Sequence, residues 1–187
     1  MLIHITSGSG PFECKVAALK LADALIGEFD DTTLLTMFNS EASLLLDGPD
    51  ELASVAGTVC WECQSPIRPI SKCTRWYVQV RVIPTLEELN ENSSNFDVVT
   101  IPVPNQLEGV NDVGVRVTHK ATGLVVACTD EDKKFKNEEI AFARMRVLLD
   151  ERLHPENKKQ PYRYPEYSPK KSVRVYKGEH FILEKKK

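Results

Sequence analysis

The sequence lacks any stretch approaching the ~18 consecutive apolar residues of a membrane-spanning helix, which argues against an integral membrane protein. It has no basic leader with a cleavage site at its start, so we expect an unsecreted protein. Its five cysteines are an odd number, which favours reduced thiols in a cytoplasmic protein over a disulfide framework. Internal repeats are absent, and the composition excludes collagenous, coiled-coil and wholly disordered proteins.

The chain has 187 residues, which is enough for one sizeable core with a small appendage. The net charge of −3 conceals an asymmetry. Residues 152–187 contain 11 Lys and Arg but only 4 Asp and Glu, a net charge of +7, so the rest of the chain carries −10. A basic end of this kind is typical of polyanion binding, although a solvated tail without a partner has the same composition.

The first half predicts an α/β domain over residues 1–84. A helix is indicated from Pro11 to about Phe29, because apolar residues recur there at helical spacing. Asp50–Ala56 suggests one or two helical turns. Alternation or short apolar runs predict strands at Leu2–Thr6, Leu34–Phe38, Ala42–Leu46, Thr58–Cys63 and Arg75–Ile83.

The second half predicts a linker at residues 85–95, a domain at 96–153 and a basic tail with Tyr and Pro residues at 154–187. Within the domain we expect a strand at Phe96–Ile101, and irregular chain at Pro102–Gly109 because two prolines lie there. A hairpin follows, turning at Lys120–Gly123, and Asn137–Leu153 is helical. The predicted fold class is therefore α+β.

Two local motifs resemble binding sites. Ser7–Gly10 lies between a strand and a helix, where an anion could bind, but no P-loop Lys-Ser/Thr follows, and a plain strand-to-helix turn is the favoured interpretation. Cys60, Cys63 and Cys73 supply three thiols, whereas structural zinc needs four ligands, and Cys60 and Cys63 on one strand would face opposite sides. We therefore expect no metal and no cofactor.

A longer pattern resembles a known family. Val115–Gly123 reads Val-Arg-Val-Thr-His-Lys-Ala-Thr-Gly and precedes Glu131, Asn137 and a helix. It resembles the hydrolase domain of class I peptide chain release factors. Gly57–Pro69 and the opening strand with Gly10–Cys14 are similar to the release factor homologue H family. The resemblance implies a hydrolase-like domain with a mixed sheet, a hairpin and a packed C-terminal helix.

The catalytic signature of that family departs in this chain. The family carries Gly-Gly-Gln in a loop that enters the ribosomal peptidyl transferase centre, where the glutamine helps to place the water attacking peptidyl-tRNA. Counting back from the matching strand puts Pro104-Asn105-Gln106 at this position, and no Gly-Gly-Gln occurs anywhere in the chain. Asp132 and Glu138 replace basic residues of the family pattern. Gln106 is the one candidate catalytic residue, and we expect weak or no hydrolysis.

The resemblance also implies contact with the ribosomal A site, rRNA and peptidyl-tRNA, and neither DNA nor a membrane. Lys72, Arg75 and Arg81 beside Trp76 and Tyr77 form a basic and aromatic cluster suited to RNA, although a solvated strand face has the same residues. The candidate RNA-binding residues are Lys72, Arg75, Arg116, His119, Lys120, Lys133, Lys134, Lys136, Arg163, Lys170, Lys171 and Arg174.

The predicted function is a cytoplasmic, ribosome-associating release factor homologue that takes part in translation termination or ribosome rescue. Two alternatives remain open. The first is an active rescue factor that hydrolyses peptidyl-tRNA through Gln106. The second is a protein-binding decoy or inhibitor on the same scaffold, which the acidic body favours because ribosome-binding surfaces are usually basic.

Overall fold

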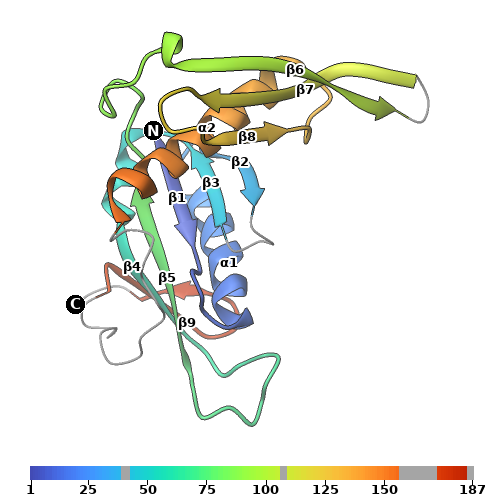
Figure 1. Ribbon diagram of the computed structural model, residues 1–187. Coiled ribbons are helices and arrows are strands. Elements are labelled where there is room, and N and C mark those ends of the chain that lie inside the picture. Colours follow the sequence, from blue (N-terminus) through green and yellow to red (C-terminus); the bar gives the residue numbers. More distant parts are fainter. Residues whose placement is uncertain (39–42, 106–108, 156–171, 185–187) are drawn as a thin grey trace. The chain divides into compact units, whose positions relative to one another are not determined.

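The computed structural model describes residues 1–38, 43–105, 109–155 and 172–184 (Figure 1). The chain divides into two units. Unit 1 comprises Met1–Val82 and Lys159–Lys187, and unit 2 comprises Ile83–Lys158. No helix in the described ranges is long and apolar enough to span a membrane. Together the units contain α-helices and mixed or antiparallel sheets, so the predicted α+β class is confirmed.

Unit 1 is built on a seven-stranded sheet in the order β10-β9-β4-β5-β1-β3-β2. Neighbouring strands are antiparallel, except that β4 and β9 are parallel. The short helix η1 spans Asp50–Val55, and α1 spans Phe12–Glu28. The strands are β1 (Leu2–Thr6), β2 (Thr33–Phe38), β3 (Ser43–Asp47), β4 (Gly57–Glu62), β5 (Arg75–Val82), β9 (Arg174–Lys177) and β10 (Ile182–Leu183).

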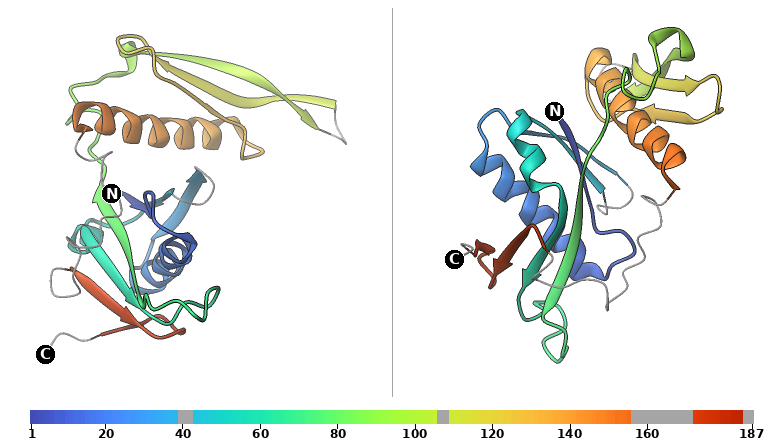
Figure 2. Two further views of the ribbon diagram at one scale, coloured as in Figure 1. Left: turned by 60° about the horizontal axis from the view of Figure 1, so that its bottom comes forward. Right: turned by 90° about the vertical axis from the view of Figure 1, so that its left-hand side faces the viewer.

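Helix α1 covers one face of this sheet (Figure 2). The helix buries a stripe at helical spacing that includes Ala18, Leu21 and Leu25, while alternate strand residues such as Ile3 and Trp61 meet it. The opposite face carries a separate small cluster of Cys60, Tyr77 and Val175. Cys63 belongs to the α1 side, so the prediction that Cys60 and Cys63 face opposite sides is confirmed.

The C-terminal segment is part of unit 1. The prediction of a tail is wrong for residues 172–184, because β9 pairs in parallel with β4 and β10 returns against β9. Phe181 stacks on Tyr176 with ring centroids 4.1 Å apart, and Trp61 Nε1 donates to Gly178 O at 2.8 Å. The segment's basic composition obscured a short alternating strand whose partner lies more than a hundred residues earlier.

Unit 2 is a three-stranded antiparallel sheet in the order β6-β7-β8 with α2 along one face (Figure 2). Its elements are η2 (Ser93–Asn95), β6 (Phe96–Asn105), β7 (Gly109–His119), β8 (Val125–Cys128) and α2 (Lys134–Leu153). Val115 and Val117 are fully buried and alternate with exposed Arg116, which is the pattern of a sheet covered on one face.

The expectation of irregular chain over Pro102–Gly109 is wrong for residues 102–105 and 109, which lie in strands, while residues 106–108 lie outside the described part of the chain. Strand β6 continues through Pro102 and Pro104 to Asn105, which pairs with Gly109. Proline is tolerated here because β6 is an edge strand, so a missing N–H on its outer side breaks no ladder. The expectation that a proline interrupts a strand holds for a strand that is paired on both sides.

Candidate functional site

The hairpin of β6 and β7 extends beyond the body of unit 2. Strand β8 pairs only with Val115–Thr118 of β7, whereas Gly109–Gly114 pairs with β6 alone. These six residues form a two-stranded arm about 20 Å long. Pro104 and Asn105 occupy its last two pairs, with Val110 and Gly109. Gln106 lies outside the described residues, directly after this ladder.

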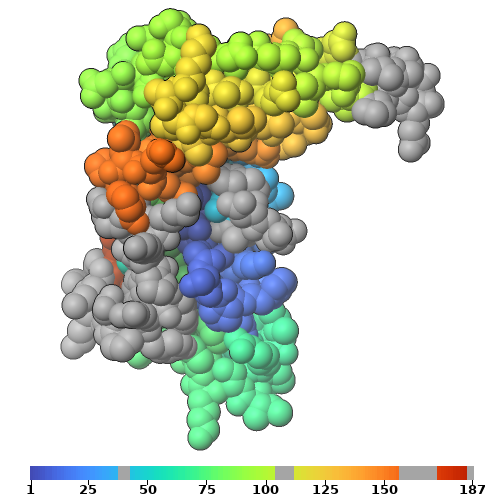
Figure 3. Space-filling view, in the orientation of Figure 1, coloured from blue at the N-terminus to red at the C-terminus, as the bar shows by residue number. Residues whose placement is uncertain are grey.

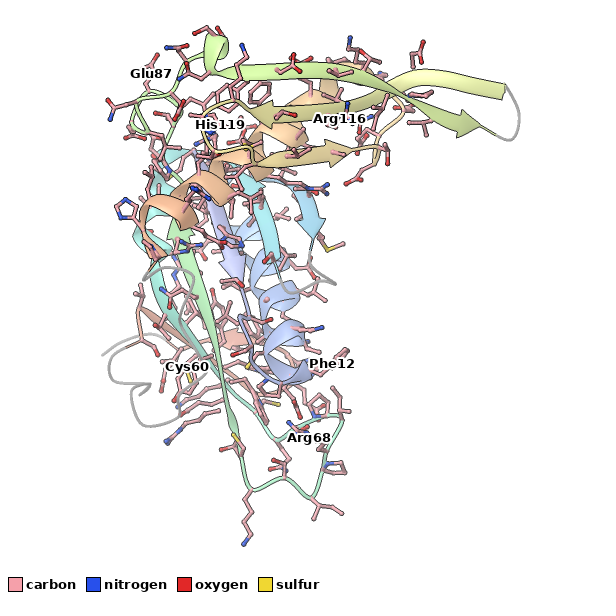
Figure 4. All side chains as sticks on the ribbon, in the orientation of Figure 1. Phe12, Cys60, Arg68, Glu87, Arg116 and His119 are labelled. Atoms are coloured by element: carbon pink, nitrogen blue, oxygen red, sulfur yellow. The ribbon has the colours of Figure 1, made fainter. Side chains whose placement is uncertain are left out.

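Arg116 lies on the outer face of the three-stranded sheet (Figure 4). Its cross-strand partners are Val99 on β6 and Ala127 on β8, and all three residues are exposed. The neighbouring residues of β7 point the other way, into the contact with α2. Arg116 is therefore presented to solvent on a largely uncharged face, where it is available to a polyanion.

His119 is not available to RNA, so its prediction as an RNA-binding residue is wrong. Its side chain is only 1% exposed. The ring packs against Phe96 at 5.1 Å, Nδ1 lies 2.8 Å from Thr122 Oγ1, and Nε2 lies 3.0 Å from Glu91 Oε2. A hydrogen bond from Asn95 and the contact with His119 lower the pKa of the Glu91 carboxyl. The histidine holds the hairpin turn to the segment before β6.

The predicted lysines of unit 2 lie in two places. Lys120 is exposed in the hairpin turn, where its Nζ donates to Ser94 O at 2.7 Å. Lys133, Lys134 and Lys136 are exposed at the start of α2, which has no acidic residue in its first turn. Phe135, 64% exposed between these lysines, was not singled out from the sequence, because the predicted helix began only at Asn137.

Ser7–Gly10 forms a turn, as predicted, in which the Gly10 N–H donates to Ser7 O at 3.0 Å, and the place where an anion could bind at the start of α1 is taken by Glu13. The carboxylate of Glu13, 1% exposed, lies in the first turn of α1. It accepts hydrogen bonds from Ser65 Oγ at 2.6 Å and from Arg68 Nε and Nη2 at 2.8 and 2.6 Å. These bonds, the Arg68 bond first, lower the pKa of Glu13 to about 2. The N-terminus of α1 thus already faces an anion, and that anion belongs to the chain.

The β4–β5 loop, residues 63–74, is ordered by this contact. Ser65 Oγ also accepts from the backbone N–H of Arg68 at 2.8 Å, and Gln64 Nε2 donates to the carbonyls of Pro69 and Ser71, each at 2.9 Å. The loop protrudes from the rest of unit 1 (Figure 3, turquoise to green). It leaves the apolar side chain of Ile70 95% exposed, and the sequence analysis did not single out this residue.

The basic residues around this loop have different environments. Lys72 is exposed, and Arg75 is exposed with its Nε 3.0 Å from Glu62 Oε1. Arg81 is half-buried and lies 3.1 Å from His4 Nδ1. Trp76 and Tyr77 are buried in the unit, so they do not form the aromatic RNA contact that the sequence suggested.

Of the four RNA-binding residues predicted in the tail, Arg174 alone lies within the described part of the chain. Its guanidinium binds both carboxylate oxygens of Glu28 and lies 5.7 Å from the Phe29 ring, which fixes β9 to the end of α1. This structural pairing argues against a role in RNA binding. Arg163, Lys170 and Lys171 lie outside the described residues.

The cysteine side chains show no sign of a metal centre. Among the described residues, His, Cys, Asp and Glu do not gather into a group of three or more that could hold an ion. Burial raises the pKa of the Cys60 thiol to about 12, and it also raises the pKa values of Cys63 and Cys128. Such thiols behave as small apolar groups.

The similar proteins described here are peptide chain release factors or a homologue of them. No family model matches the chain. It is 28% identical over 156 residues to a peptide chain release factor homologue of Escherichia coli, covering 75% of this chain and 76% of that protein. It is 41% identical over 93 residues to peptide chain release factor 1 of Treponema denticola, but covers only 25% of it. RF2 of Thermus thermophilus matches 94% of the chain with a TM-score of 0.52 and 20% identity, over 57% of its own length.

Proposed function

Because this chain is homologous to a peptide chain release factor homologue and has a class I release factor fold, we propose that it is a ribosome-associated protein of the release factor type with weak or no peptidyl-tRNA hydrolysis. The observation that carries the proposal is the β6–β7 arm, in which Pro104 and Asn105 continue the strand ladder up to Gln106. The proposal places the protein in the cytoplasm, at the ribosomal A site.

The reduced hydrolysis follows from the residues at the end of the arm. In the pattern that this chain resembles, two glycines precede the glutamine and permit backbone conformations that other residues rarely adopt. Pro104 fixes φ near −65° and has no N–H, and Asn105 adopts a left-handed conformation less readily than glycine. A donor misplaced by ~1 Å costs on the order of a hundredfold in rate.

Contact with the ribosome is proposed for the exposed basic residues of both units. Arg116, Lys120 and the three lysines at the start of α2 would meet RNA phosphates from unit 2, and Lys72 with Arg75 would do so from unit 1. Because each phosphate contact releases counterions, binding should weaken steeply as the salt concentration rises, and it should depend on these local positive charges.

The test measures release of labelled peptide from ribosomes carrying peptidyl-tRNA, intact or damaged at the decoding centre, with cosedimentation in parallel. We expect saturable ribosome binding with release close to that of the buffer control. Substantial release that disappears in Gln106→Ala would overturn the loss of hydrolysis and identify an active rescue factor. Cosedimentation no better than that of an unrelated acidic protein would overturn ribosome association altogether.

A protein-binding role is the second candidate, and the β4–β5 loop favours it. Ile67 and Ile70 are 50% and 95% exposed on a loop fixed by hydrogen bonds, as are the apolar anchors of many protein interfaces. Cross-linking from position 70 distinguishes the two candidates. Recovery of one protein without rRNA would favour a decoy or inhibitor, and recovery of rRNA would exclude it.

A further inference from the structure

The β6–β7 arm begins at a bulge between Ile101–Val103 of β6 and Asn111–Gly114 of β7, a region called the root of the arm below. Ile101 pairs with Gly114 and Val103 pairs with Asn111, so that Pro102 alone faces both Asp112 and Val113. Val113 lies two residues beyond Val115, where the pairing of β7 with β8 ends, so β8 supplies no donor to the Val113 carbonyl. That carbonyl needs a donor from elsewhere, because buried carbonyl groups are almost always paired.

Asn137 supplies that donor from α2. Its side chain is fully buried, and Nδ2 donates to Val113 O at 2.9 Å and to Glu131 O at 2.8 Å. Its Oδ1 accepts from Glu131 N at 2.9 Å and from Cys128 Sγ at 3.3 Å. Both amide hydrogens and both oxygen lone pairs are thus used. One side chain joins α2, β8, the turn before α2 and the root of the arm.

The packing at the root leaves little freedom around these bonds. Gly114 lies so close to β6 that a Cβ at this position would be 2.8 Å from Ile101 O and 2.6 Å from Ile101 Cγ1. The same atom would be 3.0 Å from Thr129 Cγ2 on the other side. Strand β8 ends its pairing at Val115, so nothing else in the sheet supports the arm beyond this point.

We propose that Asn137 is a positioning residue that fixes the direction in which the β6–β7 arm leaves unit 2. It acts by giving the Val113 carbonyl the donor that β8 does not supply, and Gly114 permits the close approach of β6 that this geometry needs. The relevance of the arm's direction for ribosome binding rests on the function proposed above, whereas the positioning itself is a property of the isolated chain.

The test uses the full chain with Cys73→Ser and spin labels at Gly109→Cys, at the arm's end, and Glu139→Cys, exposed on α2. We expect a narrow distance distribution that Asn137→Ser broadens or shifts. Hydrogen exchange at the Glu131 amide should become roughly tenfold faster, as expected when a local hydrogen bond is lost. An unchanged distribution in folded Asn137→Ser would overturn the proposal.

Two further variants separate positioning from stability. Met145→Ala removes a fully buried side chain of α2 away from the root, and it should lower the unfolding midpoint without altering the distribution. Equal broadening in this control would overturn the proposal. If Asn137→Ser does not fold, Gly114→Ala tests the same root. We expect Gly114→Ala to shift the distance distribution, and an unchanged distribution would overturn the proposal. Ribosome cosedimentation is measured separately, so a chain that never binds ribosomes refutes only the proposed function.

Discussion

Arg68 binds the buried carboxylate of Glu13 with two nitrogen atoms, Nε to Oε1 at 2.8 Å and Nη2 to Oε2 at 2.6 Å. Glu13 lies in the first turn of α1 and Arg68 in the β4–β5 loop, so the pair fixes the loop to the helix. Arg68 also lies 5.9 Å from the Trp76 ring centroid. The protruding loop thus has a defined conformation before any partner arrives.

Glu13→Gln should lower the free energy of unfolding by about 2 kcal/mol at neutral pH, because hydrogen bonds to a charged acceptor are lost. The folded-state pKa of Glu13 is about 2, below its ordinary value of 4.5. Its stabilisation is therefore complete above pH 4.5 and disappears as the pH falls through 2. Chemical denaturation at several pH values measures the difference, which should shrink across this window.

A matched control for this prediction is Glu51→Gln, an exposed acid in η1. It should change the free energy of unfolding by less than about 0.5 kcal/mol at any pH. A constant difference between wild type and Glu13→Gln from pH 6 to pH 2 would contradict the role assigned to the ionised carboxylate.

His4 gives unit 1 a second dependence on pH. Burial, and then the Arg81 guanidinium, lower the pKa of His4 from 6.5 to about 3. Between these values the unfolded chain binds a proton that the folded chain does not, so stability falls as the pH drops from 6.5 towards 3. The slope for one proton is about 1.4 kcal/mol per pH unit.

His4→Gln should remove this slope, because glutamine still offers an oxygen to Arg81 but does not titrate. The measurement is the free energy of unfolding from pH 7.5 to pH 4. Exposed His180 provides the control, since His180→Gln should leave the curve of the wild type unchanged. Parallel curves for wild type and His4→Gln would refute the prediction.

Much of the fold could be predicted from periodicity, and the exceptions share a cause. Strand β5 was indicated by alternating apolar residues, of which Trp76, Val78 and Val80 do belong to the core on the α1 side. Strand β9 could not be found in this way, because it is short and its neighbour β4 precedes it by a whole inserted unit. The prediction ended strand β6 at Ile101, whereas it continues to Asn105. Pro102 is tolerated because β6 is an edge strand, and that position is a property of the sheet which the local sequence does not reveal.

The candidate site was predictable only where exposure follows from strand alternation. Arg116 is exposed because its neighbours Val115 and Val117 are buried. His119 lies on the same face of β7 as Val115 and Val117, so alternation also predicts its burial, and its assignment to RNA binding came from the family resemblance. Glu91 and Phe96, which enclose it, come from the segment before β6 and from its first residue. The Glu13–Arg68 pair joins residues 55 positions apart, a contact that no local pattern reveals.

The C-terminal segment should stabilise unit 1 through Phe181. Its ring stacks on Tyr176 and lies 6.0 Å from Trp61. Phe181→Ala should lower the free energy of unfolding by about 1–3 kcal/mol, since it removes a partly buried aromatic contact. Neighbouring Ile182 is 65% exposed, and Ile182→Ala should cost less than about 0.5 kcal/mol. Equal losses in the two variants would show that the segment does not pack as described.

Restoring glycine at the end of the arm tests the proposed loss of hydrolysis directly. Pro104→Gly with Asn105→Gly returns the conformational freedom that the resembled pattern has before its glutamine. Peptide release should rise by roughly tenfold to a hundredfold, the range expected when one backbone donor regains its place. Adding Gln106→Ala to this double variant should abolish the gain. If the double variant binds ribosomes as the wild type does but releases no more peptide, then Pro104 and Asn105 are not what limits hydrolysis, and the other departures from the family pattern, such as Asp132 and Glu138, are the next to test.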